Sequence, residues 1–174
     1  MPEILSKSDK ILDQVYIVNR LKELAGNWEG TGNAEYPTIE HAEYKEELLI
    51  NCNSTEQLIH YEQKTWKLSP GGEIIDTLNW QSGFFIVQEN GEITFVNAQN
   101  SGRTEVMKGN MYNGNEPGKY KLILQSIAFG NDERMLSATR EYLFTKNTIE
   151  YEMKMKTTMV ERLAMHLSCK LVRV

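Results

Sequence analysis

Apolar and polar residues alternate along most of this chain, and the period of the alternation changes near residue 25. From Ser8 to Leu24 the apolar residues recur at the three- and four-residue spacing of one helix face. They are Ile11, Leu12, Val15, Val18 and Leu21. Ser8 is a suitable N-cap and Gly26 a suitable stop. The pattern predicts an N-terminal helix within residues 1–24.

After residue 25 the period becomes two, which is typical of half-buried strands. In NTIEYEMKMKT, Ile149, Tyr151, Met153 and Met155 share one face, and Glu150, Glu152, Lys154 and Lys156 share the other. About ten such segments follow one another, separated by turn compositions such as SPGGE, ENGE and NGNEPG. Since no long helix separates them, residues 25–174 are predicted to form an all-β, antiparallel up-and-down barrel. The helix would pack on this barrel.

The composition is that of a soluble globular domain, with 40% hydrophobic and 25% charged residues. The net charge of -5 argues against nucleic-acid binding, which needs a basic face. No apolar run approaches the roughly 18 residues of a membrane span, and the first residues lack a secretory signal pattern. Cys52 and Cys169 make no disulfide framework. We therefore expect a cytoplasmic protein without membrane or nucleic-acid partners.

Common catalytic and metal-binding motifs are not evident in the sequence. His166 and Cys169 are three apart, so in a strand their side chains point to opposite faces and should not meet. The chain has no H-x-x-x-H, C-x-x-C or H-E-x-x-H motif, and its paired carboxylates are typical of solvated faces. A barrel with few polar groups favours an apolar ligand. His166 in the apolar terminal strand is compatible with a structural role or with haem ligation.

Two early motifs carry a family resemblance. Gly26, Trp28, Gly30 and Gly32 fill a G-x-W-x-G-x-G pattern, and Tyr36, Pro37 and Thr38 follow. With AQNSG and a terminal strand containing His166 and Leu167, the chain resembles the nitrobindin family from about Leu24 to Val174. The members of that family are haem-binding β-barrels, similar in shape to lipocalins and fatty-acid-binding proteins.

The resemblance implies a ligand and a function. His166 would be the axial ligand of one ferric haem b per chain, with Thr38 and Met155 at the haem pocket and no catalytic residue beyond the iron. The protein would bind nitric oxide or isomerise peroxynitrite to nitrate, although whether it is an enzyme stays open. A preparation made without added haem can be empty, and the oligomeric state stays open, with a dimer among the options.

The parity of the last strand constrains His166. Leu167, Cys169 and Leu171 share one face, and His166 shares the other with Ser168 and Lys170. If the leucine face is the interior, His166 must sit at a bulge or before the regular strand begins. We expect the second arrangement, which would place His166 at the barrel mouth.

Two other functions stay open. Ala164 and Met165 precede His166, where family members commonly have a threonine two residues before the histidine. This departure keeps a haem-free carrier or sensor of a fatty acid or other apolar ligand as the alternative. An acid–base enzyme that uses barrel carboxylates has less support, and would need an inward carboxylate with a raised pKa.

Overall fold

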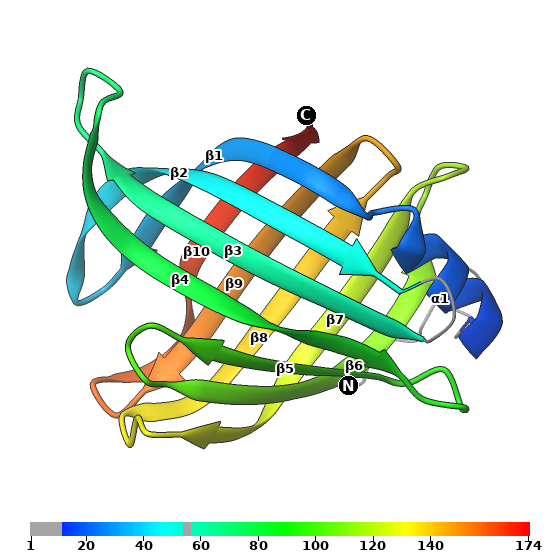
Figure 1. Cartoon of the computed structure of the whole chain (residues 1–174). Helices are drawn as coiled ribbons and strands as arrows, with labels where there is room; N and C mark the ends of the chain where they lie inside the picture. The colour runs from blue at the N-terminus through cyan, green and yellow to red at the C-terminus, as the bar shows by residue number, and fades with distance from the viewer. Residues whose placement is uncertain (1–11, 54–56) are drawn as a thin grey trace.

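The two-residue alternation along the chain becomes the inside–outside alternation of a closed barrel. The computed structural model describes residues 12–53 and 57–174 (Figure 1). Each strand pairs with its neighbours in sequence, all antiparallel, and the first closes on the last. The ten strands are β1 (Gly26–Tyr36), β2 (Ile39–Cys52), β3 (Leu58–Leu68), β4 (Ile74–Val87), β5 (Ile93–Gln99), β6 (Thr104–Asn113), β7 (Tyr120–Gly130), β8 (Met135–Phe144), β9 (Thr148–Thr157) and β10 (Val160–Arg173). The predicted fold class is confirmed.

Strand β9 shows why these sequences form a barrel. Its apolar residues are buried at alternate positions, and the charged residues between them lie on the outer face. The buried residues are Ile149, Tyr151, Met153 and Met155. Burying one face of every strand removes apolar area from water, and closing the sheet removes both of its edges.

A short helix, α1 (Gln14–Lys22), closes one end of the barrel (Figure 1). Asp13 caps it, accepting a hydrogen bond from the backbone N–H of Tyr16 at 2.9 Å. Ser8, the predicted N-cap, lies outside the described residues. Trp28 is fully buried and donates its indole N–H to the carbonyl of Leu24 at 2.8 Å, which ties the end of the helix to β1. No helix within the described residues is long and apolar enough to cross a membrane.

A belt of hydrogen-bonded polar side chains crosses the interior of the barrel. On neighbouring strands β3 and β4, the amide of Gln81 donates to the side-chain carbonyl of Gln63. Asn97 on β5 donates to Gln81 at 3.1 Å and to Glu105 at 3.3 Å. Arg140 on β8 completes the series with an ion pair to Glu105 at 2.7 Å. All five side chains are buried, and their mutual bonds replace most of those lost to water, although Nε of Arg140 and one oxygen each of Asn97 and Glu105 have no partner among the described residues.

Glu46 is the acidic end of this belt. Its carboxyl accepts hydrogen bonds from the amide of Gln63 at 2.7 Å and the hydroxyl of Tyr151 at 2.5 Å. The hydroxyls of Tyr151 and Tyr44 are 2.9 Å apart. Glu46 is fully buried, and this burial raises the pKa of its carboxyl to about 7. A protonated Glu46 is therefore close in free energy to the charged form at neutral pH.

The belt divides the barrel interior into two compartments. Between the belt and α1 lies a small cavity of about 40 Å³ with a mostly apolar lining. Apolar residues of that lining include Leu21, Leu24, Ile50, Ile59, Phe85, Leu122, Phe144 and Ile149. On the other side of the belt the barrel opens to solvent.

Replacing Glu46 with glutamine should flatten the pH dependence of stability. Because the pKa is raised in the folded state, the folded protein keeps a proton that the unfolded chain loses above about pH 4.5. The free energy of unfolding of the wild type should therefore fall between about pH 5 and pH 8, by at most about 3 kcal/mol. Urea unfolding across that range measures the slope.

Glu47→Gln is the matched control, because Glu47 is the outward-facing neighbour with a surface ion pair to Lys45. It should keep the wild-type slope. A slope in Glu46→Gln equal to that of the wild type would contradict the assignment.

Candidate functional site

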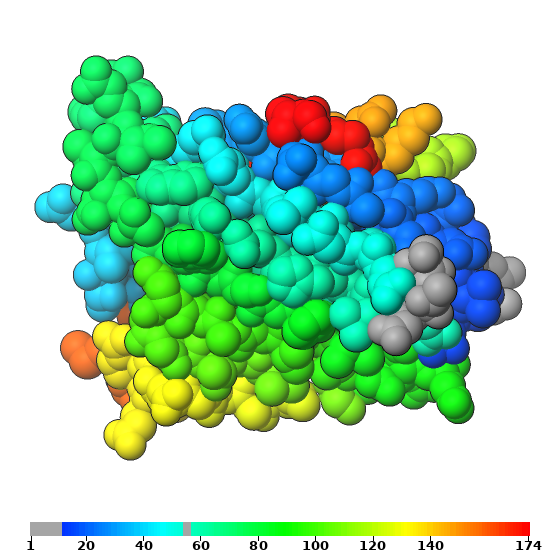
Figure 2. Space-filling view, viewed as in Figure 1, coloured from blue at the N-terminus to red at the C-terminus, as the bar shows by residue number. Residues whose placement is uncertain are grey.

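A pocket of about 320 Å³ opens at the end of the barrel opposite α1, and we call it the mouth pocket. Its volume is in the range of small-molecule sites. The apolar part of its wall comprises Ala34, Ile39, Leu78, Met153 and Leu167. Its polar part includes His166, Tyr44, Gln63, Gln81, Arg103, Asp132, Arg134 and Arg140. Figure 2 shows the hairpin between β3 and β4 projecting from this end of the molecule.

His166 reaches the pocket through a bulge in β10. Met165 pairs with Lys154 on β9 and Leu167 pairs with Met153, so His166 has no pairing partner on β9. The extra residue lets two successive side chains, His166 and Leu167, line the same pocket. The expectation that His166 precedes the regular strand is wrong, because β10 begins at Val160. Its expected position at the barrel mouth agrees with the structure.

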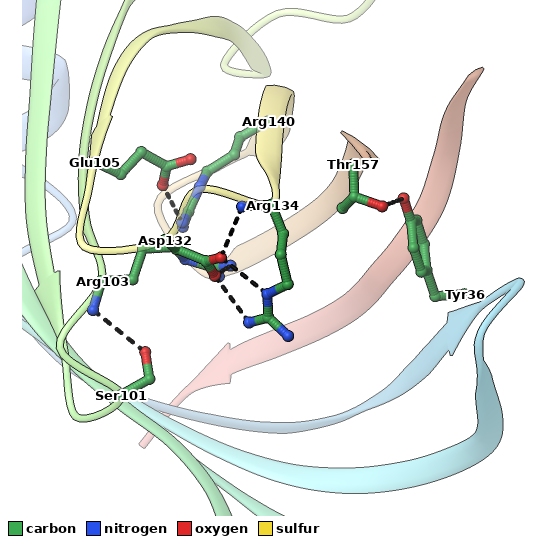
Figure 3. Close-up of polar contacts among 8 residues, drawn as sticks. All are labelled: Tyr36, Ser101, Arg103, Glu105, Asp132, Arg134, Arg140 and Thr157. Atoms are coloured by element: carbon green, nitrogen blue, oxygen red, sulfur yellow. Dashed lines mark hydrogen bonds and ion pairs between the residues drawn. The ribbon is translucent and has the colours of Figure 1, made fainter. Parts of the chain in front are cut away.

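The imidazole of His166 is held in one orientation by β1. Its Nδ1 lies 3.3 Å from the backbone carbonyl oxygen of Glu35, which can only accept, so Nδ1 carries the proton in this contact. The ring of Tyr36 meets the imidazole edge to face at 5.7 Å between centroids. The hydroxyl of Tyr36 is anchored by Thr157 on β9, at 3.2 Å (Figure 3). This arrangement leaves Nε2 with its lone pair for a ligand.

Electrostatics also keep this imidazole neutral. Burial lowers the pKa of His166, and the positive charges of Arg103 and Arg140 lower it further. The hydrogen bond to Glu35 opposes this shift without cancelling it. A neutral imidazole with a fixed tautomer is the form that binds a metal.

The other predicted pocket residues take different positions. Thr38 is exposed in the turn between β1 and β2, next to the pocket residue Ile39. Met155 is buried on β9, but Met153 is the methionine that lines the mouth pocket. Neither Thr38 nor Met155 lines the mouth pocket with His166, and their roles toward haem stay predictions.

The two remaining histidines lie away from the pocket. His60 is on the outer face of β3, where its Nε2 lies 2.8 Å from the hydroxyl of Ser82. His41 is exposed and contacts Asn33 at 3.0 Å. Neither lines the mouth pocket.

Sequence reasoning missed the residues that orient His166. The Tyr-Pro-Thr motif did point to this region, but it is Tyr36 that touches the imidazole, and the sequence prediction chose Thr38. The arginines of the pocket come from three separate segments, and no local pattern marks them.

The donor set fits an iron porphyrin. Among residues 12–53 and 57–174, no three His, Cys, Asp or Glu side chains gather as metal ligands. His166 offers a single nitrogen, which suits a metal whose other ligands come from a macrocycle. The apolar wall gives such a macrocycle a surface to pack on.

Comparisons with known proteins point the same way. A protein-family sequence model, described as the THAP4-like, heme-binding β-barrel domain, matches residues 18–173 of this chain. A protein named peroxynitrite isomerase Rv2717c from Arabidopsis thaliana is 36% identical over 138 residues, 79% of this chain and 78% of that protein. A ferric nitrobindin-like protein from Streptomyces griseus is 24% identical over 88 residues, 51% of this chain and 46% of its own length. The crystal structure of Rv2717c from M. tuberculosis superposes with a TM-score of 0.78 at 25% identity, covering 90% and 96% of the two chains.

The tautomer and charge of His166 can be measured in the apo-protein. At pH 7 we expect a neutral ring with the proton on Nδ1, and a pKa below the usual value of about 6.5. Long-range ¹H–¹⁵N spectra of the imidazole report both quantities in one titration. A ring protonated mainly on Nε2, or a pKa above the usual value, would contradict the geometry.

Proposed function

The chain belongs to the nitrobindin family of haem-binding β-barrels, and we propose from this premise that it binds one ferric haem b in the mouth pocket through His166. We propose further that the protein binds nitric oxide or isomerises peroxynitrite to nitrate. The observation that carries the proposal is the imidazole of His166, oriented by the backbone carbonyl of Glu35 beside an apolar wall. The names of its relatives support the choice of reaction.

The residues of this chain would have distinct tasks in that activity. The carbonyl of Glu35 and the ring of Tyr36 fix the imidazole plane, so that Nε2 presents a lone pair without reorganisation. Leu167 and Met153, which line the same pocket, would offer apolar surface next to the iron ligand. When bound, a ferric haem with one imidazole supplies an open coordination position for a small molecule.

An apolar carrier without haem is the second candidate, and the cavity beside α1 is the observation in its favour. That cavity of about 40 Å³ holds only a few water-sized molecules. A long acyl chain that entered from the mouth would have to cross the buried belt and break hydrogen bonds such as Gln63 to Glu46. Each unpaired group would cost about 1–3 kcal/mol. The structure therefore favours a ligand held at the mouth.

Hemin titration tests the ligand assignment. Adding hemin to the purified apo-protein should produce a Soret band and saturate at one equivalent. His166→Ala should weaken hemin binding at least about tenfold, because it removes the only proposed protein bond to iron. Absorbance and tryptophan quenching follow the titration.

His60→Ala and His41→Ala are matched controls, since both histidines lie outside the mouth pocket. They should bind hemin as the wild type does. Equal spectra and affinities for His166→Ala and the wild type would refute the axial assignment.

The reaction needs a separate measurement. The ferric haem-loaded protein should accelerate the decay of peroxynitrite in stopped-flow experiments and raise the yield of nitrate over nitrite. The apo-protein should give only the uncatalysed rate. Acceleration no greater than that of free hemin at the same concentration would reduce the proposal to haem binding alone.

A further inference from the structure

The mouth pocket carries more positive than negative charge. Arg103, Arg134 and Arg140 line it together with Asp132. Glu105 pairs with Arg140 at 2.7 Å. Three guanidinium groups therefore face two carboxylates, which leaves one positive charge at the mouth of a chain whose formal net charge is -5.

The guanidinium of Arg134 neutralises most of the negative charge of Asp132. The guanidinium of Arg134 contacts both carboxylate oxygens, with Nε at 2.9 Å from Oδ1 and Nη2 at 3.0 Å from Oδ2 (Figure 3). This two-point geometry is the strongest that the pair can adopt, and its hydrogen bonds lower the pKa of Asp132. Arg103 is left with one longer contact, from Nη1 to Asp132 at 3.5 Å.

Arg103 is thus a shielded and incompletely neutralised cation. Its side chain is only 17% exposed, and burial lowers the pKa of its guanidinium. Its Nε is buried and has no hydrogen-bond partner among the described residues, and the same is true of Nε of Arg140. Buried N–H groups without acceptors are costly, so an acceptor that enters the pocket is stabilised there.

These cations share the pocket with His166, and the charges of Arg103 and Arg140 reach its imidazole. We propose that Arg103 and Arg140 form a subsite for a planar oxyanion beside His166, which takes a carboxylate or a nitrogen oxyanion. A guanidinium fork matches two coplanar oxygens. The identity of the occupant rests on the proposed function. The subsite would hold either a carboxylate of the haem or the nitrogen oxyanion that reacts. Anion binding itself needs no haem.

Titration of the apo-protein with sodium nitrate, and separately with sodium acetate, tests the subsite. Constant ionic strength removes the general salt effect. The Nε–H signal of Arg140 and the backbone amides around Gly102 should shift with saturation. Arg103→Gln should weaken binding about tenfold, the equivalent of one lost charge-assisted hydrogen bond. Asp132→Asn should tighten it, because the competing carboxylate charge is gone.

Arg162→Gln is the matched control, since Arg162 is exposed on β10 and does not line the pocket. It removes the same charge and should leave the affinity unchanged. Shifts without saturation in the wild type, or equal affinities for Arg103→Gln and Arg162→Gln, would overturn the proposal. Asp132→Asn keeps the test decisive if Arg103→Gln does not fold.

Hemin and hemin dimethyl ester distinguish the two sources of the oxyanion. If a haem carboxylate occupies the subsite, Arg103→Gln should weaken binding of hemin about tenfold and leave binding of the ester unchanged. If the occupant is a nitrogen oxyanion, hemin and hemin dimethyl ester should both bind Arg103→Gln as they bind the wild type, while nitrate binding is weakened about tenfold. Nitrate binding to a protein that takes up no hemin would refute the proposed function and leave the subsite standing.

Discussion

The close contact between β1 and β10 is the constraint on which the rest of the barrel depends. Gly30 and Gly32 allow it, because a Cβ at Gly30 would meet the backbone of Lys170 and one at Gly32 would meet the carbonyl of Ser168. The space beside Gly32 is filled by the ring of Tyr44. The same seam joins residues 131 positions apart, since Glu35 of β1 orients His166 of β10. The pairing of β1 with β10 therefore both closes the barrel and brings Glu35 next to His166.

The interior of this barrel is polar at mid-height, and this feature shapes what it can hold. A belt from Glu46 to Arg140 satisfies most of its own hydrogen bonds, and breaking one partner would leave a buried polar group unpaired. An elongated apolar ligand that crossed the belt would carry that cost. A flat ligand at the mouth would avoid the belt and meet the apolar wall and His166.

The sequence predicted the architecture because alternation is local, and β9 lies within the alternating segment NTIEYEMKMKT. Strand parity showed that His166 could not sit in a regular strand, but it could not choose between a bulge and the strand end. That choice depends on register with β9, which is a long-range property. Arg103, Arg140 and Tyr36 could not be assigned to the site for the same reason, since each reaches it from a different strand or turn. The sequence also did not show that Glu46 points inward, because the neighbouring residue, Glu47, is a glutamate as well.

The arginine side chains at the mouth are compatible with a neutral imidazole of His166. Positive charges near an imidazole disfavour its protonation, so Arg103 and Arg140 help to keep the Nε2 lone pair of His166 free. A guanidinium stays protonated at any physiological pH and does not coordinate metals. A lysine in the same shielded position could lose its proton and compete as a ligand. In the proposed site, arginine would therefore attract an anion and leave Nε2 of His166 free for the iron at once, whereas a lysine would put the two requirements in conflict.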